Sequence, residues 1–385
     1  MTRPLHVAIL ANIPRHSTRG NSQGRGGGHG ATWLPPLADA FLEHPELKIT
    51  WITFDHQVRQ PETDQDGNQT FLRLPKPHDK LNLLLNQRLT RRILRRVLRD
   101  LQPDLIHAWG TEWMYASVMQ DVSLPRILSV QGCLTTFNQC WKTSWAHRQL
   151  EKQEPKRVAE ADIITCESLW SAEQIRPLAP DPDIRIVDYG VHPSFFEVPW
   201  QPDEQNPTLA FSGSVDRRKG MDVLFDALEL LPDRPWTLRI FGHGPMEAEL
   251  RARNLPKVEW MGTLRWQEMQ QHLSRAWGLV IPTRADTGPT VVKEARVIGL
   301  PVIGTRNGGL RDYIRHGENG LIVDPLDAQT LANACASLMG DFDKVRIMGR
   351  SHHSEDRKAF SPALTAARFS EIYAELVANR SAGGW

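Results

Sequence analysis

The sequence predicts an α/β protein with two domains, each built on a parallel sheet, and three observations support this. The chain has 385 residues, which is more than a single hydrophobic core usually holds. Short apolar runs typical of buried parallel strands alternate with segments of helical periodicity. A proline-rich stretch over residues 199–207 separates two such series and is the expected linker. We therefore expect a first domain over residues 1–195 and a second over residues 196–365.

Composition argues against several classes of protein. Charged residues make up 24% of the chain and the formal net charge is +1, so no overall field points to nucleic acid. The apolar run near the amino terminus is too short for the core of a signal peptide, and no apolar stretch approaches the roughly 18 residues of a membrane span. The four cysteines show no metal-binding spacing: Cys133, Cys140, Cys166 and Cys335. These features predict a soluble cytoplasmic protein.

In the first half, apolar runs alternate with periodic segments. The expected strands cover residues 5–11, 49–54, 103–109, 127–132, 162–166 and 184–187, and the expected helices cover residues 31–42, 81–101 and 151–161. Gly27 and Gly28 lie in a loop between the first strand and the first helix, where glycine lets backbone N–H groups approach a phosphate. A surface loop explains these glycines equally well. His107, near the end of its strand, fits either a core histidine or a site residue.

The helical segment over residues 81–101 interleaves leucines with arginines. Its cations, with the preceding lysine, are Lys80, Arg88, Arg91, Arg92, Arg95, Arg96 and Arg99. A basic amphipathic helix of this kind suits an anionic membrane surface. A packing helix whose arginines face water is the alternative, and both interpretations stay open. Trp141 and Trp145 indicate a nearby loop that binds an acceptor or faces a membrane.

In the second half, an apolar run over residues 278–282 leads through a polar loop into a helix. Open α/β sheets bind anionic ligands at this kind of junction. Gly288 and Pro289 precede the helix, and Pro289 suits its first turn because proline has no N–H to satisfy. We expect a phosphate at the N–H groups near Thr290 and Val291.

Two carboxylates, Asp286 and Glu294, flank this phosphate position and lie eight residues apart. Eight residues of helix span roughly 12 Å, whereas the paired carboxylates of a retaining hydrolase lie about 5–5.5 Å apart. The spacing therefore suits binding of the two ends of one elongated ligand. The alternative is a solvated loop aspartate and a glutamate on a helix face.

A second loop follows the expected strand over residues 208–213 and carries three adjacent cations, Arg217, Arg218 and Lys219. Charge-assisted hydrogen bonds from such side chains suit a diphosphate. A solvated basic loop is the alternative.

Taken in order, these motifs resemble the retaining GT-B glycosyltransferases of the large group-one family (glycosyltransferase family four), which includes sucrose synthases and bacterial mannosyltransferases. Asp286 and Glu294 resemble the ends of the family's acidic motif, although Asp286 stands where Glu is usual. Lys219 matches a family lysine, whereas Ser214, after Gly213, stands where an arginine is usual, so Arg217 or Arg218 would supply that charge. The resemblance also assigns positions at the donor or acceptor to Gln131 (where many members have His), Gly27, Gly28, Gly242, His243 and Met261.

The resemblance implies a GT-B fold, in which two Rossmann-like domains face each other across a cleft and the final helix, over residues 366–385, returns to the first domain. It implies transfer of a sugar from a UDP- or GDP-sugar to an acceptor hydroxyl with retention of anomeric configuration. Asp286 would hold the sugar hydroxyls and Glu294 the nucleotide ribose. Lys219 and Arg218 would stabilise the departing diphosphate, so no metal ion or other cofactor is expected.

The expected acceptor is a saccharide or a lipid-linked molecule, as in polysaccharide, lipopolysaccharide or glycolipid synthesis. Peripheral contact with an anionic membrane, at the inner face of the plasma membrane, would accompany such a role, and nucleic acid is not an expected partner. Two alternatives stay open: a nucleotide-sugar epimerase of the same fold, and a degenerate, non-catalytic sugar-nucleotide-binding protein.

Overall fold

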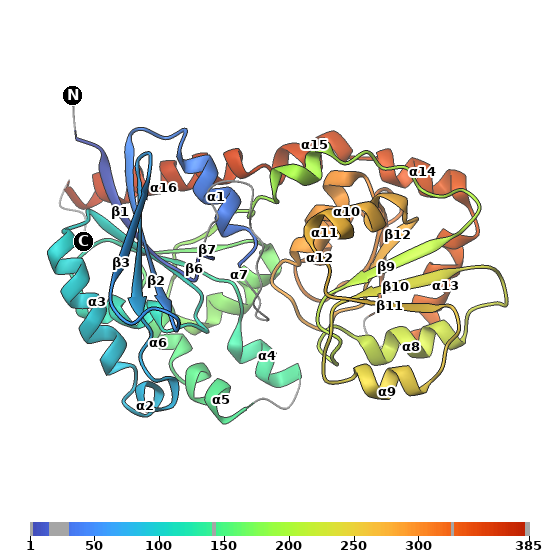
Figure 1. Cartoon of the computed structure of the whole chain (residues 1–385), viewed down its shortest axis with the longest axis horizontal. Coiled ribbons are helices and arrows are strands. Elements are labelled where there is room, and N and C mark those ends of the chain that lie inside the picture. Colours follow the sequence, from blue (N-terminus) through green and yellow to red (C-terminus); the bar gives the residue numbers. More distant parts are fainter. Residues whose placement is uncertain (1–2, 15–30, 141–143, 325–326, 382–385) are drawn as a thin grey trace. The chain divides into compact units, whose positions relative to one another are not determined.

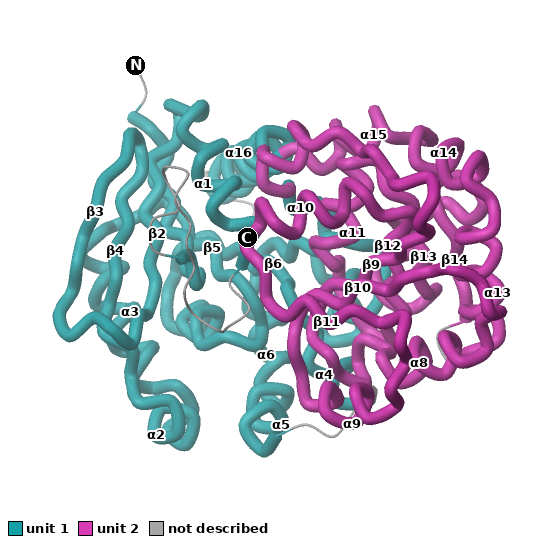
Figure 2. The backbone as a smooth tube through the Cα atoms, turned by 45° about the vertical axis from the view of Figure 1, so that its right-hand side comes forward, with its two compact units in different colours: residues 1–190, 362–385 teal, residues 191–361 magenta. Residues whose placement is uncertain are grey.

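The structure, a computed structural model, describes residues 3–14, 31–140, 144–324 and 327–381. It divides into two compact units, coloured separately in Figure 2. Unit 1 contains Met1–Gly190 and Pro362–Trp385, and unit 2 contains Val191–Ser361. Each unit is an α/β layer structure with its own sheet (Figure 1).

Unit 1 is built on an eight-stranded sheet in the order β3-β4-β2-β1-β5-β6-β7-β8. Its strands are β1 (Leu5–Leu10), β2 (Leu47–Asp55), β3 (Glu62–Asp66), β4 (Gln69–Pro75), β5 (Leu105–Trp109), β6 (Arg126–Ser129), β7 (Ile163–Cys166) and β8 (Ile184–Ile186). Neighbouring strands are parallel except β3 and β4, which form a hairpin. The apolar runs did not predict this hairpin, because β3 reads ETDQD and holds no apolar residue.

The helices of unit 1 come from both ends of the chain. They are α1 (Leu34–Phe41), α2 (Asp79–Leu84), α3 (Arg88–Leu101), η1 (Tyr115–Asp121), α4 (Leu134–Cys140), α5 (Trp145–Glu151), α6 (Glu154–Ala159), α7 (Leu169–Ile175), η2 (Arg176–Leu178) and α16 (Pro362–Ser381). The C-terminal helix α16 packs beside α1, with the rings of Tyr373 and Phe41 6.3 Å apart. This return of the last helix to the first unit agrees with the GT-B resemblance.

His107 is a core histidine. Its side chain is fully buried, with Nδ1 2.7 Å from the Tyr373 hydroxyl and Nε2 2.6 Å from Ser129 Oγ. Burial lowers the pKa of His107 to about 3. The histidine therefore stays neutral and ties α16 to the sheet.

Two expected elements of unit 1 differ from the structure. The helix expected over residues 81–101 is interrupted, because Asn86 and Gln87 adopt left-handed backbone angles between α2 and α3. The segment around Trp145, expected as a loop, begins helix α5, where Ser144 Oγ accepts a hydrogen bond from the His147 N–H at 3.2 Å. Trp141 lies outside the described residues.

Unit 2 is built on a six-stranded sheet in the order β11-β10-β9-β12-β13-β14, parallel throughout. Its strands are β9 (Thr208–Ser212), β10 (Thr237–Phe241), β11 (Val258–Gly262), β12 (Gly278–Ile281), β13 (Val302–Thr305) and β14 (Gly320–Val323). Its helices are η3 (Pro193–Glu197), α8 (Met221–Glu229), α9 (Glu247–Ala252), α10 (Trp266–Arg275), α11 (Thr290–Ile298), α12 (Leu310–Tyr313), α13 (Ala328–Met339), α14 (Phe342–Arg350) and α15 (His353–Ala359).

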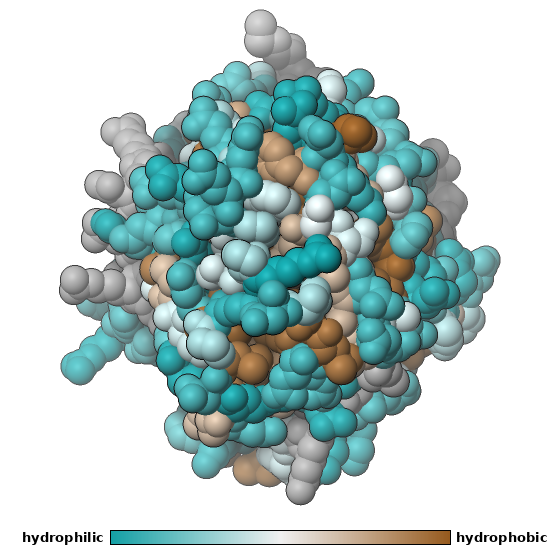
Figure 3. Space-filling view, turned by 90° about the vertical axis from the view of Figure 1, so that its right-hand side faces the viewer, coloured by the Kyte–Doolittle hydropathy of each residue, from teal (hydrophilic) through white to brown (hydrophobic). Residues whose placement is uncertain are grey.

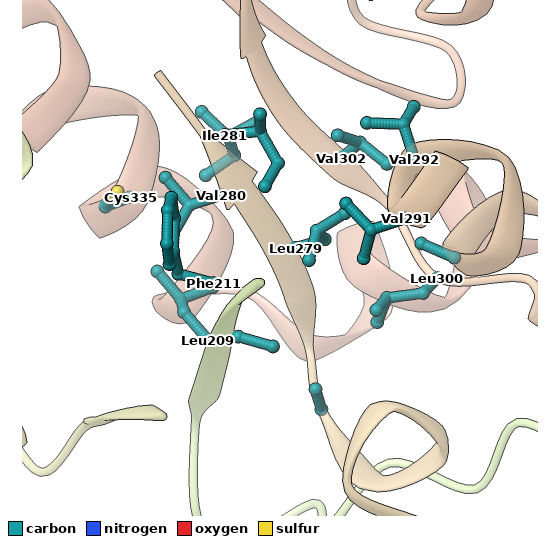
Figure 4. Packing of buried hydrophobic residues seen from close by; sticks show 14 of the residues in the cluster. Leu209, Phe211, Leu279, Val280, Ile281, Val291, Val292, Leu300, Val302 and Cys335 are labelled. Carbon is teal, nitrogen blue, oxygen red and sulfur yellow. The ribbon is translucent and has the colours of Figure 1, made fainter. Parts of the chain in front are cut away.

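The core of unit 2 fixes the neighbouring strands β9 and β12. Figure 4 shows Phe211 of β9 beside Val280 of β12, with Val291 and Val292 of α11 on the other side of β12. These side chains are all buried. Because apolar packing holds both strands and the helix, the loops at the strand ends leave from a rigid support.

No helix in the described ranges is a candidate to span a membrane. None of the helices there combines the length and the apolar character that crossing a bilayer requires. Figure 3 shows one face of the molecule, which is largely hydrophilic and carries only small hydrophobic groups.

Candidate functional site

The candidate site lies where the strand order of unit 2 reverses. From β9 the chain builds outward through β10 and β11, then crosses to the other side of β9 to place β12, β13 and β14. In open α/β sheets, ligands bind at such a switch point, outside the carboxyl ends of the strands. The loops over residues 213–220 and 282–289 leave β9 and β12 at that point.

Lys219 and Asp286 meet between these two loops. Lys219 is 7% exposed and Asp286 is 9% exposed, and Lys219 Nζ donates to Asp286 Oδ2. Arg218 Nη1 lies 3.4 Å from the same carboxylate oxygen. Burial acts to raise the pKa of Asp286, but Lys219 and Arg218 outweigh it and hold that pKa below its ordinary value of 3.8. The structure thus brings together three of the predicted site residues.

Backbone and side-chain contacts hold the two loops together. The Arg218 carbonyl accepts hydrogen bonds from the Arg284 N–H at 2.8 Å and from Thr283 Oγ1 at 3.1 Å. The Arg284 guanidinium binds both oxygens of Asp222, at 2.7 and 2.9 Å. Arg284 and Asp222 were not among the predicted site residues. They are 62 residues apart in the sequence, and no local pattern indicates that their side chains form an ion pair.

The backbone after β13, at Gly308 and Gly309, contacts the backbone of Asp286. Gly308 has φ +82°, and a Cβ at this position would lie 2.6 Å from the Asp286 carbonyl oxygen. The N–H of Gly309 donates to that same oxygen at 2.8 Å. Only glycine allows this close approach without strain, so the Asp286 backbone is held by the neighbouring strand end.

Helix α11 begins four residues after Asp286. Pro289 is the N-cap residue and Thr290 the first helical residue, so Pro289 lies one position earlier than predicted. Within the described chain, no side chain caps α11 and no acidic residue occupies its first turn. The N–H groups of Thr290 and Val291 have no partner within the helix, and they carry the positive end of its dipole. The Gly288 N–H is 3.4 Å from Asp286 Oδ1.

Glu294 lies in the second turn of this helix and is 6% exposed. Burial raises its pKa to about 7, against the attraction of Lys293. A buried carboxyl without a bonded cation is expensive to ionise. Hydroxyl donors from a ligand would offset that cost.

The remaining predicted residues of unit 2 line the carboxyl ends of adjacent strands. Gly213 and Ser214 follow β9, and the Gly213 N–H donates to the Phe241 carbonyl at 2.9 Å. Gly242 follows β10, and its N–H donates to the carbonyl of Gly262, the last residue of β11, at 2.8 Å. Met261 is the half-buried residue before that glycine.

Two predicted residues point to other partners. The side chain of Arg217 is 67% exposed and lies 3.7 Å from Asp222. The side chain of His243 is 59% exposed and lies 2.8 Å from Glu247. Within the described ranges neither side chain bonds to Lys219 or Asp286, so Arg218 rather than Arg217 supplies the second cation of the cluster.

In unit 1, Gln131 follows β6 and is half-buried, while Gly27 and Gly28 lie outside the described residues. Two carboxyls near the same strand ends, the buried Glu154 and the half-buried Glu112, were not predicted. Glu154 accepts hydrogen bonds from the N–H groups of Leu134 at 2.9 Å and Thr135 at 2.8 Å. Burial raises the pKa of Glu112 to about 7. Glu112 follows a strand end by three residues, which is a usable signal, whereas the partners of Glu154 are too distant in sequence to suggest it.

Comparison with known proteins identifies the family. Residues 206–341, which contain the cluster, match the family model described as Glycosyl transferases group 1. The segment over residues 206–341 is a domain of the group 1 glycosyl transferases. The predicted family is therefore confirmed.

Curated relatives of this chain are similar to it over parts of their length. An exopolysaccharide phosphotransferase of Streptomyces coelicolor is 36% identical over 160 residues, which are 39% of this chain and 16% of that protein. The sulfoquinovosyl transferase SQD2 of Arabidopsis thaliana is 22% identical over 72% of this chain and 58% of its own length. A D-inositol 3-phosphate glycosyltransferase of Corynebacterium glutamicum is 30% identical over 46% of this chain and 45% of its own length. The matched segments thus span about a sixth to just over half of these relatives.

Solved structures confirm the GT-B fold. Sucrose-phosphate synthase from Thermosynechococcus elongatus superimposes with a TM-score of 0.78 at 20% identity, covering 97% of this chain and 99% of that one. Anabaena HepE, solved with UDP and glucose, gives a TM-score of 0.69 at 15% identity over 96% of this chain and all of that one.

Proposed function

We propose that this group 1 glycosyl transferase moves a sugar from a nucleoside-diphosphate sugar to an acceptor hydroxyl, with retention of anomeric configuration. The observation that carries the proposal is the buried Lys219–Asp286 pair, flanked by Arg218, between the loops after β9 and β12. The uncapped N-terminus of α11 begins four residues further on. Cations, a carboxylate and free N–H groups at a switch point form a site for a ligand that joins a diphosphate to hydroxyl groups.

In this mechanism the diphosphate is the leaving group. The bond between the anomeric carbon and the diphosphate oxygen breaks, and the electron pair goes to that oxygen. Lys219, Arg218 and the N–H groups of Thr290 and Val291 stabilise the new charge. Each well-placed donor of this kind typically contributes about 2.7–4 kcal/mol to lowering the barrier.

Asp286 holds the sugar through its hydroxyl groups. Its carboxylate is bound by Lys219 and faces Arg218, and its lowered pKa makes it a weak nucleophile. We therefore favour attack by the acceptor hydroxyl on the face from which the diphosphate leaves, through an oxocarbenium-like state. The proton of the acceptor passes to the departing diphosphate oxygen, and the configuration at the anomeric carbon is retained.

Glu294 binds the ribose of the nucleotide. The 2′ and 3′ hydroxyls would donate to its carboxylate and thereby favour the ionised form in a buried setting. HepE was solved with UDP and glucose, which supports a uridine donor as the first to test, with guanosine donors as the alternative. The proposed acceptor is a saccharide or lipid-linked hydroxyl in polysaccharide, lipopolysaccharide or glycolipid synthesis.

The test is a panel of UDP- and GDP-sugars incubated with the full chain. We expect thermal stabilisation by one nucleotide, slow release of that nucleotide from its sugar donor, and an unchanged anomeric configuration in the product by NMR. Conversion of the donor without release of nucleotide would indicate an epimerase instead. Binding without any turnover would indicate a non-catalytic protein, and an inverted product would contradict retention.

A further inference from the structure

The segment α2–α3 of unit 1 presents large apolar side chains to solvent. Leu81, Leu84 and Leu85 are 49%, 69% and 39% exposed and lie within five consecutive residues. The backbone turn at Asn86 and Gln87 then starts α3. Other large exposed apolar residues in the described chain are scattered singly, as on most protein surfaces. A cluster of this kind marks an interaction surface.

Helix α3 carries a row of exposed arginines along one face. The opposite face of α3 carries Thr90, Leu94 and Leu98 and is buried. Leu94 and Leu98 belong to the hydrophobic core that includes residues of the unit 1 sheet. The exposed row consists of Arg88, Arg92, Arg95, Arg96 and Arg99. Spacings of three and four residues place these guanidinium groups on one side of the helix.

The arginine row borders a groove of about 910 Å³, which Arg92, Arg95, Arg96 and Arg99 line on one side and residues 121–124 on the other. Arg91 pairs at 2.6 Å with Asp121, which itself lines the groove. Over the ranges that the structure describes, no carboxylate lies within ion-pair distance of Arg92, Arg95 or Arg96. Arg92, Arg95 and Arg96 therefore bring three positive charges to the groove without protein counter-ions in the described ranges, whereas Arg99 lies 3.6 Å from Asp100.

We propose that the docking face, composed of Leu81, Leu84, Leu85, Arg88, Arg92, Arg95, Arg96 and Arg99, binds the surface of an anionic lipid bilayer. The leucines enter the boundary between headgroups and acyl chains, and the arginines contact the lipid phosphates. Apolar contact combined with attraction to anionic lipid is the usual basis of interfacial binding. A soluble polyanion would engage the arginines alone and leave the leucines exposed to water.

A second segment of unit 1 supports this orientation. Helix α5 begins with Trp145, which is 49% exposed, and tryptophan is enriched at membrane interfaces. In Figures 1 and 2, α2 and α5 both project from the same end of unit 1. Segments α2 and α4–α5 each follow the carboxyl end of a strand, β4 and β6 respectively. Docking would therefore bring that end of the sheet, with Gln131, to the bilayer. A lipid-linked acceptor resides there, and this link between docking and the acceptor rests on the proposed function.

The experiment is flotation of the full chain with vesicles of phosphatidylcholine alone and with vesicles that also contain about one third phosphatidylglycerol. We expect binding to the anionic vesicles, little binding to the neutral ones, and release by high salt. Arg95→Gln/Arg96→Gln should weaken vesicle binding about 30-fold, and Leu84→Ser should weaken it roughly tenfold. All these positions are exposed, so the variants should unfold at the temperature of the unmodified protein.

Helix α14 of unit 2 supplies matched controls. Ile347 is 70% exposed. In the same helix, Arg346 directly precedes it and Arg350 follows it by three residues. Ile347→Ser and Arg346→Gln/Arg350→Gln should leave vesicle binding unchanged. Equal loss in these controls, equal binding to both kinds of vesicle, or full binding by the α2–α3 variants would each overturn the proposal.

Two further measurements separate this proposal from others. Retention of the chain on immobilised heparin without vesicle binding would overturn bilayer docking in favour of a soluble polyanion. Thermal stabilisation by UDP and GDP, measured without vesicles, should be the same in all variants. If neither nucleotide stabilises any of them while vesicle binding behaves as expected, the proposed function fails and the docking face stands.

Discussion

Lys219 and Asp286, 67 residues apart in the sequence, form a buried ion pair that joins the loop after β9 to the loop after β12. Burying two charges is costly, and their attraction compensates only while both partners are present. The pair therefore links the stability of unit 2 to the groups that we assign to the diphosphate and the sugar. A variant that removes one partner will affect both properties, and they must be measured separately.

Replacing Lys219 with methionine should abolish most transfer. The loss of one charge-assisted donor to the leaving diphosphate predicts a fall in kcat of about 10²–10³-fold. The uncompensated Asp286 carboxylate should also lower the free energy of unfolding by roughly 3 kcal/mol. Steady-state kinetics with the identified donor and urea unfolding measure the two effects.

Two comparisons test this assignment. The double variant Lys219→Met/Asp286→Leu should regain most of the lost stability, because neither buried charge remains, while transfer stays absent. Arg217→Met removes a cation that is 67% exposed and outside the cluster, so it should change kcat less than about threefold. A Lys219→Met enzyme with normal turnover would remove Lys219 from the mechanism.

Glu294 should make the stability of unit 2 depend on pH. Its pKa rises on folding from 4.5 to about 7, so the folded state holds the proton more tightly than the unfolded state. The resulting stabilisation is complete below about pH 4.5 and is lost as the pH rises through 7. Glu294→Gln should therefore be more stable than the unmodified protein at about pH 8, by up to roughly 3 kcal/mol, and equally stable at about pH 4.

The same residue should couple pH to nucleotide binding. If the ribose hydroxyls donate to the ionised carboxylate, affinity for the intact nucleotide sugar should increase between about pH 5.5 and 7.5. Glu294→Gln should bind more weakly and show a flat profile. Calorimetric titration across this range provides the measurement, and an identical pH profile in both proteins would show that the nucleotide does not touch Glu294.

Much of the fold follows from local sequence signals. Apolar runs marked the parallel strands because both faces of such strands are buried, and the run over residues 278–282 led to β12 and α11. The hairpin of β3 and β4 was missed because β3 is exposed and polar. The break between α2 and α3 was missed because it depends on left-handed backbone angles at Asn86 and Gln87. Neither position is a glycine or a proline, the residues that usually signal such a break.

The site was predictable only in part. Sequence placed Lys219, Arg218 and Asp286 on two strand-end loops, and the strand order brings those loops together. Which of the adjacent cations reaches Asp286 depends on side-chain direction, and Arg217 turns to Asp222 instead. The bidentate contact of Arg284 with Asp222 also arises only from tertiary packing, so no local pattern shows it.

That contact should stabilise the pair of loops. The Arg284 side chain is 11% exposed, and its two terminal nitrogens each donate a hydrogen bond to a different oxygen of Asp222. A double-mutant cycle with Arg284→Met and Asp222→Leu should give a coupling energy of about 1–3 kcal/mol. Arg284→Lys should recover little of it, because lysine cannot form the planar two-point contact. A coupling energy near zero in urea unfolding would show that the loops are held by backbone contacts alone.

A methyl group at Gly308 should disturb the site, whereas one at Gly317 should not. Both glycines have left-handed backbone angles, φ +82° and +84°, so alanine should cost each position about 1 kcal/mol of stability. At Gly308 the new Cβ would also lie 2.6 Å from the Asp286 carbonyl oxygen, whereas at Gly317 no atom of the described residues, apart from the two chain neighbours, lies within 4 Å. The clash must displace Asp286, and a shift of about 1 Å in a reacting site can cost about 10²-fold in rate. The measurements are steady-state kinetics and urea unfolding of Gly308→Ala and Gly317→Ala. We expect a selective loss of transfer in Gly308→Ala. Equal rates in the two variants would mean that the position of Asp286 does not limit the reaction.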